Sequence, residues 1–465
     1  MVQPIDITRL VIFGYLNFIP VLTNQWSAVI LPLILRNNLK IEDESSYTLI
    51  AVYFFISFFV GINIGCFLWP LLVGHLTKRN CILISVVVMG IANTASGLYL
   101  NVFYICFWRV VAGAALNLHT VGKDFLFEFC HDDQYRQYGL TLDSCFALVG
   151  NIMGPFIGYE IYSHNGFDFT RSCLWIGGMF LVGVVAFLLA FFINYEIKVS
   201  SISDDEEKEL VMRLRRKSST QVMSSKNYFD VFKEAFKTPS VRNIILLFTI
   251  ATTCTNCDLI LSVFYLQTSW EDEGLGVSAS ALSYVSLTAF FSALAIISAS
   301  LKFVPSKVSY RRFIQAIILI FSAAVIITPL LRELIPTDGR RKYLGFVYAN
   351  QIVKYCSSSH VISPFLHYLL NKKANEFIRT SLNSINYIFC TLSLVVLMNL
   401  IVPLLSWSLF CASFKRLHPF NKCLTFWIVG ALSLSGLFFV PKREKKTNYR
   451  SLPNIGLTDP IDSVI

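Results

Sequence analysis

The sequence Arg109-Val-Val-Ala-Gly113 places an arginine inside an apolar run, and Lys123 and Glu128 follow in the same run. A second apolar segment reads Gly150-Asn-Ile-Met-Gly154-Pro155-Phe-Ile-Gly158. A charge in the middle of a membrane helix costs several kcal/mol unless it is paired or hydrated, so we interpret these charged residues as functional. Glycine and proline in the neighbouring segment are typical of close, adjustable helix packing.

The composition of the whole chain is that of a membrane protein. Of its 465 residues, 55% are hydrophobic and only 15% are charged, whereas about a quarter of a soluble protein is charged. Apolar runs of about 20 residues recur, and each is long enough to span a bilayer as an α-helix. We therefore predict an all-α integral membrane protein with twelve transmembrane helices. The predicted spans are 9–35, 47–74, 81–100, 101–128, 137–162, 172–195, 242–268, 278–303, 312–331, 343–370, 377–405 and 421–440.

A polar segment divides these spans into two sets of six. Residues 196–241 are rich in charged residues and serines, and they predict a cytosolic central loop. This loop separates an N-terminal six-helix half, residues 1–195, from a C-terminal six-helix half, residues 242–440. Residues 441–465 are polar and form a predicted cytosolic tail.

The distribution of lysine and arginine predicts the orientation. These residues are concentrated in the segments that face the cytosol if both chain ends lie there, which favours an even number of spans with cytosolic termini. The bias, with attraction to anionic lipids, accounts for the net charge of +10, so no nucleic-acid partner is expected. The first apolar run is too long for a cleavable signal peptide and is expected to act as the targeting signal.

The compartment is left open between two alternatives. The tail sequence Tyr449-Arg-Ser-Leu452 resembles an endocytic sorting signal. A vacuolar, lysosomal or other endomembrane location therefore competes with the plasma membrane. We expect a monomer whose partners are a small-molecule substrate, protons and membrane lipids.

Motifs for other functions are missing from the sequence. Cys254-Thr-Asn-Cys257 has the spacing of a metal-binding pair, but no second pair or nearby histidine completes a zinc site. No phosphate-binding loop and no nucleophile elbow is present, so neither ATP-driven transport nor catalysis is indicated. We predict that the protein is not an enzyme and needs no cofactor or metal.

A polar island lies within the seventh predicted span. Asp258 ends the run Thr252-Thr-Cys-Thr-Asn256-Cys, in an otherwise apolar segment. An aspartate at this depth faces protein or water, and Lys354 of the tenth span is its expected partner. The role of Asp258 is left open between substrate or proton binding and a structural hydrogen bond. Polar residues of the spans that are candidates to line a substrate cavity, or to hydrogen-bond between helices, are Asn17, Asn24, Gln25, Asn256 and Lys354.

The fourth span carries a family resemblance. Drug:proton antiporters of the major facilitator superfamily, especially the zinc-induced-facilitator-like proteins, have the pattern R-x3-G-x3-G-x5-K-x4-E in this helix. Arg109, Gly113, Lys123 and Glu128 fall on these spacings, with Asn117 at the second glycine. The arrangement of six plus six spans with a basic central loop is similar to the plan of that superfamily.

The fifth span carries the second match. Antiporters of this branch have G-x3-G-P-x2-G-G here, and Gly150, Gly154, Pro155 and Gly158 match it, with Tyr159 in place of the last glycine. Two matches on adjacent helices at the expected places make the resemblance to the superfamily specific.

Two other regions depart from the family pattern. The loop between the second and third spans keeps Trp69, Lys78 and Arg79 but lacks the two glycines and the aspartate of relatives. That aspartate makes a contact in relatives that latches the outward-facing state, so the latch is in doubt here. The first span has Thr23-Asn24 where relatives have an acidic residue, so a possible coupling carboxylate is missing.

The resemblance implies alternating access around a central site, and proton coupling then needs an ionisable group whose environment changes. Arg109 stays charged, so its expected role is to hold a carboxylate or water. The candidate acids are Glu128, Asp143 and Asp258, although Glu128 and Asp143 are equally consistent with a gate salt bridge or a solvated helix end. Lys123 and Glu128 are five residues apart, which favours partners on neighbouring helices over a pair within one helix.

The sequence therefore predicts a secondary active transporter, coupled to protons, that moves a small organic solute or a metal chelate. The alternatives are a facilitator-fold protein that no longer transports and acts as a receptor or scaffold, and a passive uniporter.

Overall fold

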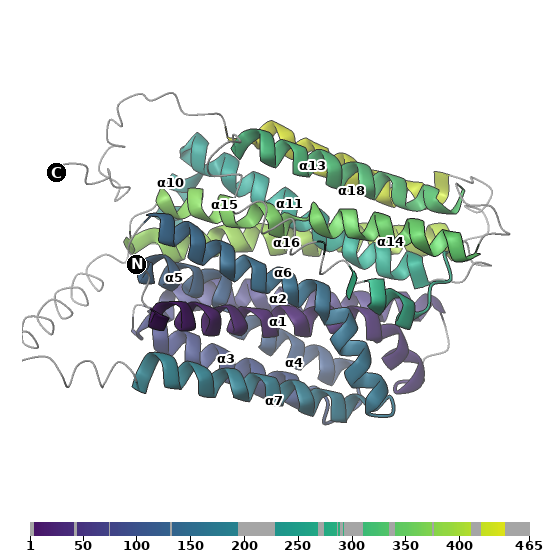
Figure 1. Cartoon of the computed structure of the whole chain (residues 1–465), viewed down its shortest axis with the longest axis horizontal. Helices are drawn as coiled ribbons and strands as arrows, with labels where there is room; N and C mark the ends of the chain where they lie inside the picture. The colour runs from purple at the N-terminus through teal and green to yellow at the C-terminus, as the bar shows by residue number, and fades with distance from the viewer. Residues whose placement is uncertain are drawn as a thin grey trace, which may run out of the picture.

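The computed structural model describes residues 4–40, 44–73, 75–130, 133–193, 228–267, 274–285, 287–288, 292, 310–333, 340–373, 376–410 and 420–441. Within this part of the chain the regular elements are all helices, which run side by side along the long axis of the molecule (Figure 1). They are α1 (Pro4–Asn37), α2 (Glu44–Val73), α3 (Lys78–Ala95), α4 (Val102–Ala115), η1 (Leu118–Gly122), α5 (Lys123–Phe129), α6 (Asp133–His164), α7 (Phe169–Leu188), η2 (Leu189–Ile193), α10 (Tyr228–Lys237), α11 (Pro239–Gln267), α13 (Tyr310–Ile327), η3 (Thr328–Arg332), α14 (Arg340–Cys356), α15 (Ser359–Lys372), α16 (Glu376–Phe410), α18 (Phe420–Ser435) and η5 (Gly436–Phe439).

The helices have the length and composition of membrane spans. In the described part of the chain, eight are long and apolar enough to cross a bilayer, and a shorter apolar helix covers Cys423–Phe439. The predicted all-α membrane fold is therefore confirmed. The predicted eighth span lies mostly outside the described residues, as do most of the central loop and the tail. The predicted domain limits stay predictions.

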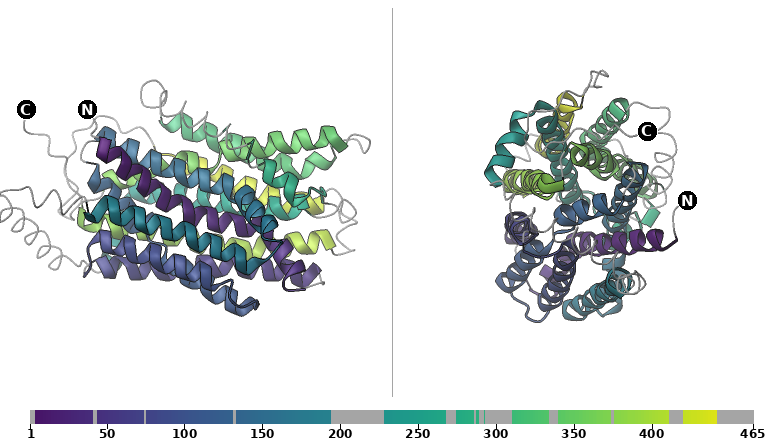
Figure 2. Two further views of the ribbon diagram at one scale, coloured as in Figure 1. Left: turned by 60° about the horizontal axis from the view of Figure 1, so that its bottom comes forward. Right: turned by 90° about the vertical axis from the view of Figure 1, so that its left-hand side faces the viewer.

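The helices form two groups. The first group comprises α1 to η2 and the second comprises α10 to η5, and the two groups lie against each other (Figures 1 and 2). Within the first group, α1 packs along α6, α2 along α4, and α3 along α7. Between the groups, α2 packs along α16 and α6 along α15.

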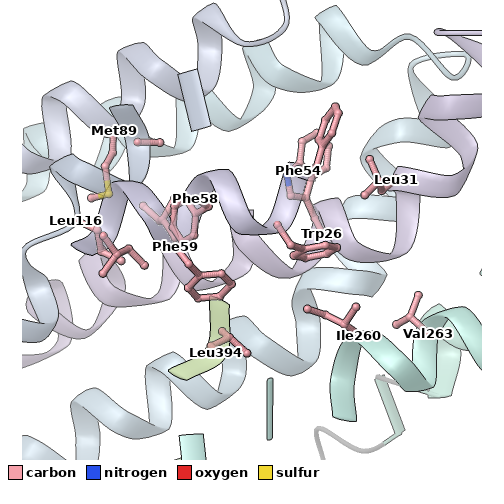
Figure 3. Packing of buried hydrophobic residues seen from close by; sticks show 14 of the residues in the cluster. Trp26, Leu31, Phe54, Phe58, Phe59, Met89, Leu116, Ile260, Val263 and Leu394 are labelled. Atoms are coloured by element: carbon pink, nitrogen blue, oxygen red, sulfur yellow. The ribbon is translucent and has the colours of Figure 1, made fainter. Parts of the chain in front are cut away.

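Buried apolar side chains join the two groups in one core. Trp26 and Phe59 of the first group and Ile260 and Leu394 of the second belong to the same cluster (Figure 3). Figure 3 shows Phe59 of α2 close to Leu394 of α16. This contact surface is where the site described below lies.

The predicted fourth span, 101–128, is present as the apolar stretch Val102–Phe129, but it is not one continuous helix. It consists of α4, a π-helical turn η1 and α5, with Leu116 in an extended conformation between them. Asn117 is fully buried and its Nδ2 donates to the carbonyl of Cys81 on α3 at 2.8 Å. This bond, made at the position where relatives have glycine, anchors the break to a neighbouring helix. An asparagine side chain competes with helical backbone bonding in this way.

The predicted tenth span, 343–370, is broken as well. α14 ends at Cys356 and α15 begins at Ser359, with Ser357 and Ser358 between them. Backbone groups inside a membrane need partners within the protein, and the amide of Ser359 finds one in the hydroxyl of Thr255 on α11 at 3.0 Å. Consecutive serines offer side-chain alternatives to helical hydrogen bonds, which is the physical reason for a break here.

The motif glycines are sites of close helix contact. A Cβ atom added at Gly113 would lie 2.1 Å from the carbonyl oxygen of Phe58 on α2, and one at Gly158 would lie 2.3 Å from Cβ of Trp26 on α1. Gly150 and Gly154 face α1 in the same way. Only glycine permits these backbone approaches, so the two glycine motifs hold α2 against α4 and α1 against α6.

We expect Gly113→Val to destabilise the protein by about 1–3 kcal/mol, because the added side chain overpacks the contact between α4 and α2. The matched control is Gly178→Val on α7, where a Cβ would meet nothing within 4 Å. Thermal unfolding of both variants in detergent measures the difference. Equal melting temperatures for the two variants would show that the glycine contact does not hold these helices.

Candidate functional site

A cavity of about 100 Å³ lies between the two groups of helices. The first group contributes residues of α1, α2, the broken fourth span and α6, and the second contributes residues of α11, α15 and α16. Four predicted cavity residues, Asn17, Asn24 and Gln25 of α1 and Asn256 of α11, are on its lining. Their role as substrate ligands stays a prediction.

A buried ion pair borders the cavity in the first group. Lys123 of α5 lines the cavity and binds the carboxylate of Asp143 on α6. Asn17 of α1 donates to the other carboxylate oxygen of Asp143 at 3.0 Å. The pair joins the fourth and fifth spans, so the expectation that Lys123 finds its partner on a neighbouring helix is confirmed.

A second buried ion pair lies in the second group. Nζ of Lys354 on α14 is 2.7 Å from Oδ1 of Asp258 on α11, and Ser262 bonds to both residues. The expected pairing of Asp258 with Lys354 is thus present. Lys354 lies outside the cavity lining, and its ammonium is 5.6 Å from the ring centre of Phe426.

Arg109 is held inside the first group. Its Nε donates to the carbonyl of Phe54 at 2.8 Å, and its guanidinium donates to Oδ1 of Asn24 at 3.2 Å. The ring of Phe58 lies 5.5 Å from the guanidinium carbon. Asn24 and Phe58 line the central cavity, so Arg109 reaches the site through two lining residues. Its predicted role of holding a carboxylate or water stays a prediction.

Three histidines on the cavity lining were not singled out from the sequence. His119 of η1 stacks on Tyr387 of α16 with ring centres 4.6 Å apart. His360 of α15 hydrogen-bonds to Asn151 of α6, and His367 of α15 packs edge-on against Phe248 of α11 at 4.7 Å. The sequence could have indicated these histidines, because each is an ionisable residue within a predicted span.

Among the residues that the structure describes, no group of three or more histidine, cysteine or acidic side chains is placed to hold a metal ion. The described cysteines of the Cys254–Cys257 sequence are buried and free. The site therefore consists of neutral polar groups, aromatic rings, histidines and the Lys123–Asp143 pair.

Comparison with known families places this fold. The sequence model of the Major Facilitator Superfamily matches residues 14–337. The chain belongs to the major facilitator superfamily. No curated protein matches the sequence.

Solved structures of facilitators share the fold. A D-xylose–proton symporter matches with a TM-score of 0.62 at 14% identity, over 94% of this chain and 96% of that chain. The proton:xylose symporter XylE bound to 6-bromo-6-deoxy-D-glucose matches with a TM-score of 0.63 at 14% identity, over 93% of this chain and 94% of that chain. At this identity the likeness concerns the fold.

A charged contact joins the two groups of this facilitator at one end. Asp124 of α5 is fully buried and lies 2.8 Å from Nζ of Lys78 and 3.3 Å from a guanidinium nitrogen of Arg379 on α16. The hydroxyl of Thr380 donates to the same carboxylate. We name Asp124, Arg379 and Thr380 the α5–α16 contact. It lies at the end of the molecule at which α1 begins (Figure 1).

Lys78, in the loop between the second and third predicted spans, supports this contact. Lys78 also binds Glu128, so Glu128 belongs to a salt bridge near the helix ends, one of the two roles left open for it. Lys78 is the first residue of α3, ahead of the predicted third span. Burial disfavours its charged form, but Asp124 and Glu128 outweigh burial, so the pKa of Lys78 is raised above its ordinary value. Lys78 therefore stays charged at neutral pH.

The other motif residues of this loop are anchors. Nε1 of Trp69 donates to the carbonyl of Ala114 at 2.9 Å, and Arg79 donates to the carbonyl of Phe191. Asp124 follows Lys123 directly but was not predicted as a site residue, because the motif contains no partner for it. Its partner Arg379 lies 255 residues further along the chain.

We expect Asp258→Leu to destabilise the protein by about 3–5 kcal/mol, because it leaves the ammonium of Lys354 buried without a counter-charge. The double variant Asp258→Leu/Lys354→Met removes both charges and should regain most of this loss. Thermal unfolding of the two single variants, the double variant and the unmodified protein measures the coupling. If the losses of stability in the two single variants simply add in the double variant, Asp258 and Lys354 do not stabilise each other as an ion pair.

Proposed function

We propose that the protein is a proton-coupled secondary active transporter that moves a small organic solute or a metal chelate by alternating access. The observation that carries this proposal is the central cavity, which both groups of helices line and which the buried Lys123–Asp143 pair borders. Membership of the superfamily and the shared fold of proton symporters support a secondary transporter.

The α5–α16 contact supplies a means of alternating access. It joins the two groups at one end, and Tyr387 of the cavity lining lies about 10 Å further along α16, at 1.5 Å per residue. Rocking the groups apart at this end requires Asp124 to leave Arg379 and Thr380. The positive-inside bias of the sequence assigns this end to the cytosol.

The two buried ion pairs are the proposed sites of proton coupling. Protonating Asp143 or Asp258 neutralises the carboxylate and releases the lysine that it holds, which changes the contacts between two helices. Asp143 is the stronger candidate, since its partner Lys123 lines the cavity. Glu128, bound by Lys78 near the helix ends, is proposed to act in gating.

The direction of coupling rests on sequence. The motifs of the fourth and fifth spans resemble the drug:proton antiporters and the zinc-induced-facilitator-like proteins, which implies exchange of solute for proton. The solved neighbours are named as symporters. The sense of the pH gradient that drives uptake decides between the two directions.

Two features favour a non-transporting receptor or scaffold, or a passive uniporter, as the second candidate. The loop between the second and third spans lacks the aspartate of relatives, and the first span lacks an acidic residue.

Two contacts oppose the second candidate. Asp124 supplies a carboxylate to α16 in this chain, and Arg109 remains bonded to the lining residue Asn24. These contacts support retained transport.

The test is solute uptake by proteoliposomes from a broad metabolite pool, with and without a pH gradient. We expect gradient-dependent uptake of at least one solute. Arg109→Ala removes the bond to the lining residue Asn24, so its uptake rate should fall about tenfold or more, which corresponds to about 1.4 kcal/mol. Arg171→Ala, whose side chain is 70% exposed, is the control that should transport normally.

The double variant Asp258→Asn/Lys354→Gln separates a proton-carrying role of the second pair from a structural one. Weakened pH dependence with retained uptake indicates proton carriage, and an unchanged pH profile leaves the pair structural. Uptake without any effect of the gradient identifies a uniporter. A folded protein that carries no solute in any condition supports the receptor or scaffold.

A further inference from the structure

The described ionisable groups that line the central cavity include no acidic residue. They are Lys123, His119, His360, His367, Tyr387 and Cys390, and the described lining contains no carboxylate. Tyrosine and cysteine are neutral near neutral pH, whereas lysine and histidine are bases. The described lining therefore offers one ammonium and three imidazoles that can donate N–H hydrogen bonds, and no negatively charged side chain. Asp143 directly precedes the lining residue Ser144 on α6. Its carboxylate is already bound by Lys123 and Asn17.

Several buried polar atoms of the lining have no hydrogen-bond partner among the residues that the structure describes. Two of them, Nδ1 of His367 and Oγ of Ser144, can donate to a ligand, and a third, Oδ1 of Asn151, can accept; the three residues are between 2% and 5% exposed. A buried polar atom without a partner costs about 1–3 kcal/mol, so sites of this kind are completed by a ligand or by water. These atoms come from α15 and α6, which places the incomplete part of the site between the two groups.

The break in the tenth span adds a further positive element. α15 begins at Ser359, and Ser359, His360 and Ser363 of its first turns lie on the cavity lining. The N-terminus of a helix carries partial positive charge that favours a nearby anion, although here the amides of Ser359 and Val361 are already bonded to Thr255 and Ser358. His367 follows His360 by seven residues, so both imidazoles lie on the same face of α15. His360 hydrogen-bonds to Asn151 of α6, which also lines the cavity.

From these observations we infer that the transported solute is a small organic anion, that its carboxylate group lies against Lys123 and His360 in the first turn of α15, and that the rest of the solute extends towards His367, about 10 Å further along the same face. The ammonium of Lys123 has three N–H donors, and its bond to Asp143 uses one of them. An organic cation would find no counter-charge on this lining, and burying an unpaired charge is costly. The inference rests on the proposed transport function and names its substrate class.

The first experiment compares solutes of equal shape and different charge. Purified full-length protein is titrated with benzoate, benzamide and benzylamine, and with propionate, propionamide and propylamine, and thermal stabilisation is recorded. We expect saturable stabilisation by at least one carboxylate at millimolar concentration, and none by its amide or amine. Stabilisation by the amides or amines alone, or by no carboxylate, overturns the inference.

The second experiment changes the charge of the lining. His360→Gln keeps a hydrogen-bonding group beside Asn151 and removes the base, so carboxylate binding should weaken about tenfold. Asn256→Asp is nearly isosteric and adds a negative charge to the cavity, so it should abolish carboxylate binding and admit the amine. His164→Gln, at an exposed histidine outside the cavity, should leave binding unchanged. Unchanged carboxylate affinity in both cavity variants overturns the inference.

Failure of this inference differs from failure of the proposed function. If proteoliposomes take up a neutral or cationic solute and no carboxylate binds, transport stands and the anion assignment falls. If no solute is carried and none binds, the proposed transport function falls with it.

Discussion

A charge or backbone polar group inside a membrane has to find its partner within the protein, and the architecture of this facilitator follows from that constraint. Lysines 123 and 354 are each held by an aspartate of a neighbouring helix. Asp124 is held by cations and a hydroxyl from both groups of helices. The buried charges therefore connect specific pairs of helices. Apolar packing alone would define the positions of these helices less strictly.

The same constraint explains where the helices break. Asn117 and the serines at 357–359 end helical hydrogen bonding at two places, and their polar groups are bonded to α3 and α11. The two broken spans are the fourth of each predicted set of six, and both border the central cavity. Each break brings histidines to the lining, His119 in one case and His360 in the other. Helical interruptions thus concentrate polar chemistry between the groups, where a solute can reach it.

Much of this arrangement was predictable from the sequence. The cost of membrane charges pointed to Arg109, Lys123 and Asp258, and Lys354 was the one lysine placed to pair with Asp258. Glycine spacing indicated close packing of the fifth span, and the structure shows that its partner is α1. The breaks were not predictable, because a single Asn or a pair of Ser residues is compatible with a continuous helix until a partner on another helix is known. Asp124 was missed for the same reason, since Arg379 and Thr380 belong to the other group.

The loop between the second and third spans lacks the aspartate of relatives, and Asp124 provides a carboxylate near this loop. Relatives place an aspartate in the loop between the second and third spans, whereas here Asp124 of the fourth span meets the first turn of α16. Lys78, a basic residue kept in that loop, supports the same carboxylate. We propose that this contact takes the place of the latch, with its acidic member on a helix instead of in the loop.

The central claim is that the two groups separate at the α5–α16 contact during transport. The most direct test is the distance between spin labels on His75 and Lys372, two exposed residues of opposite groups, measured by double electron–electron resonance in lipid nanodiscs. We predict two distance populations, with Asp124→Asn shifting the protein towards the longer one and Asp168→Asn, on the exposed cap of α7, leaving the balance unchanged. A single distance that Asp124→Asn does not alter would contradict the account.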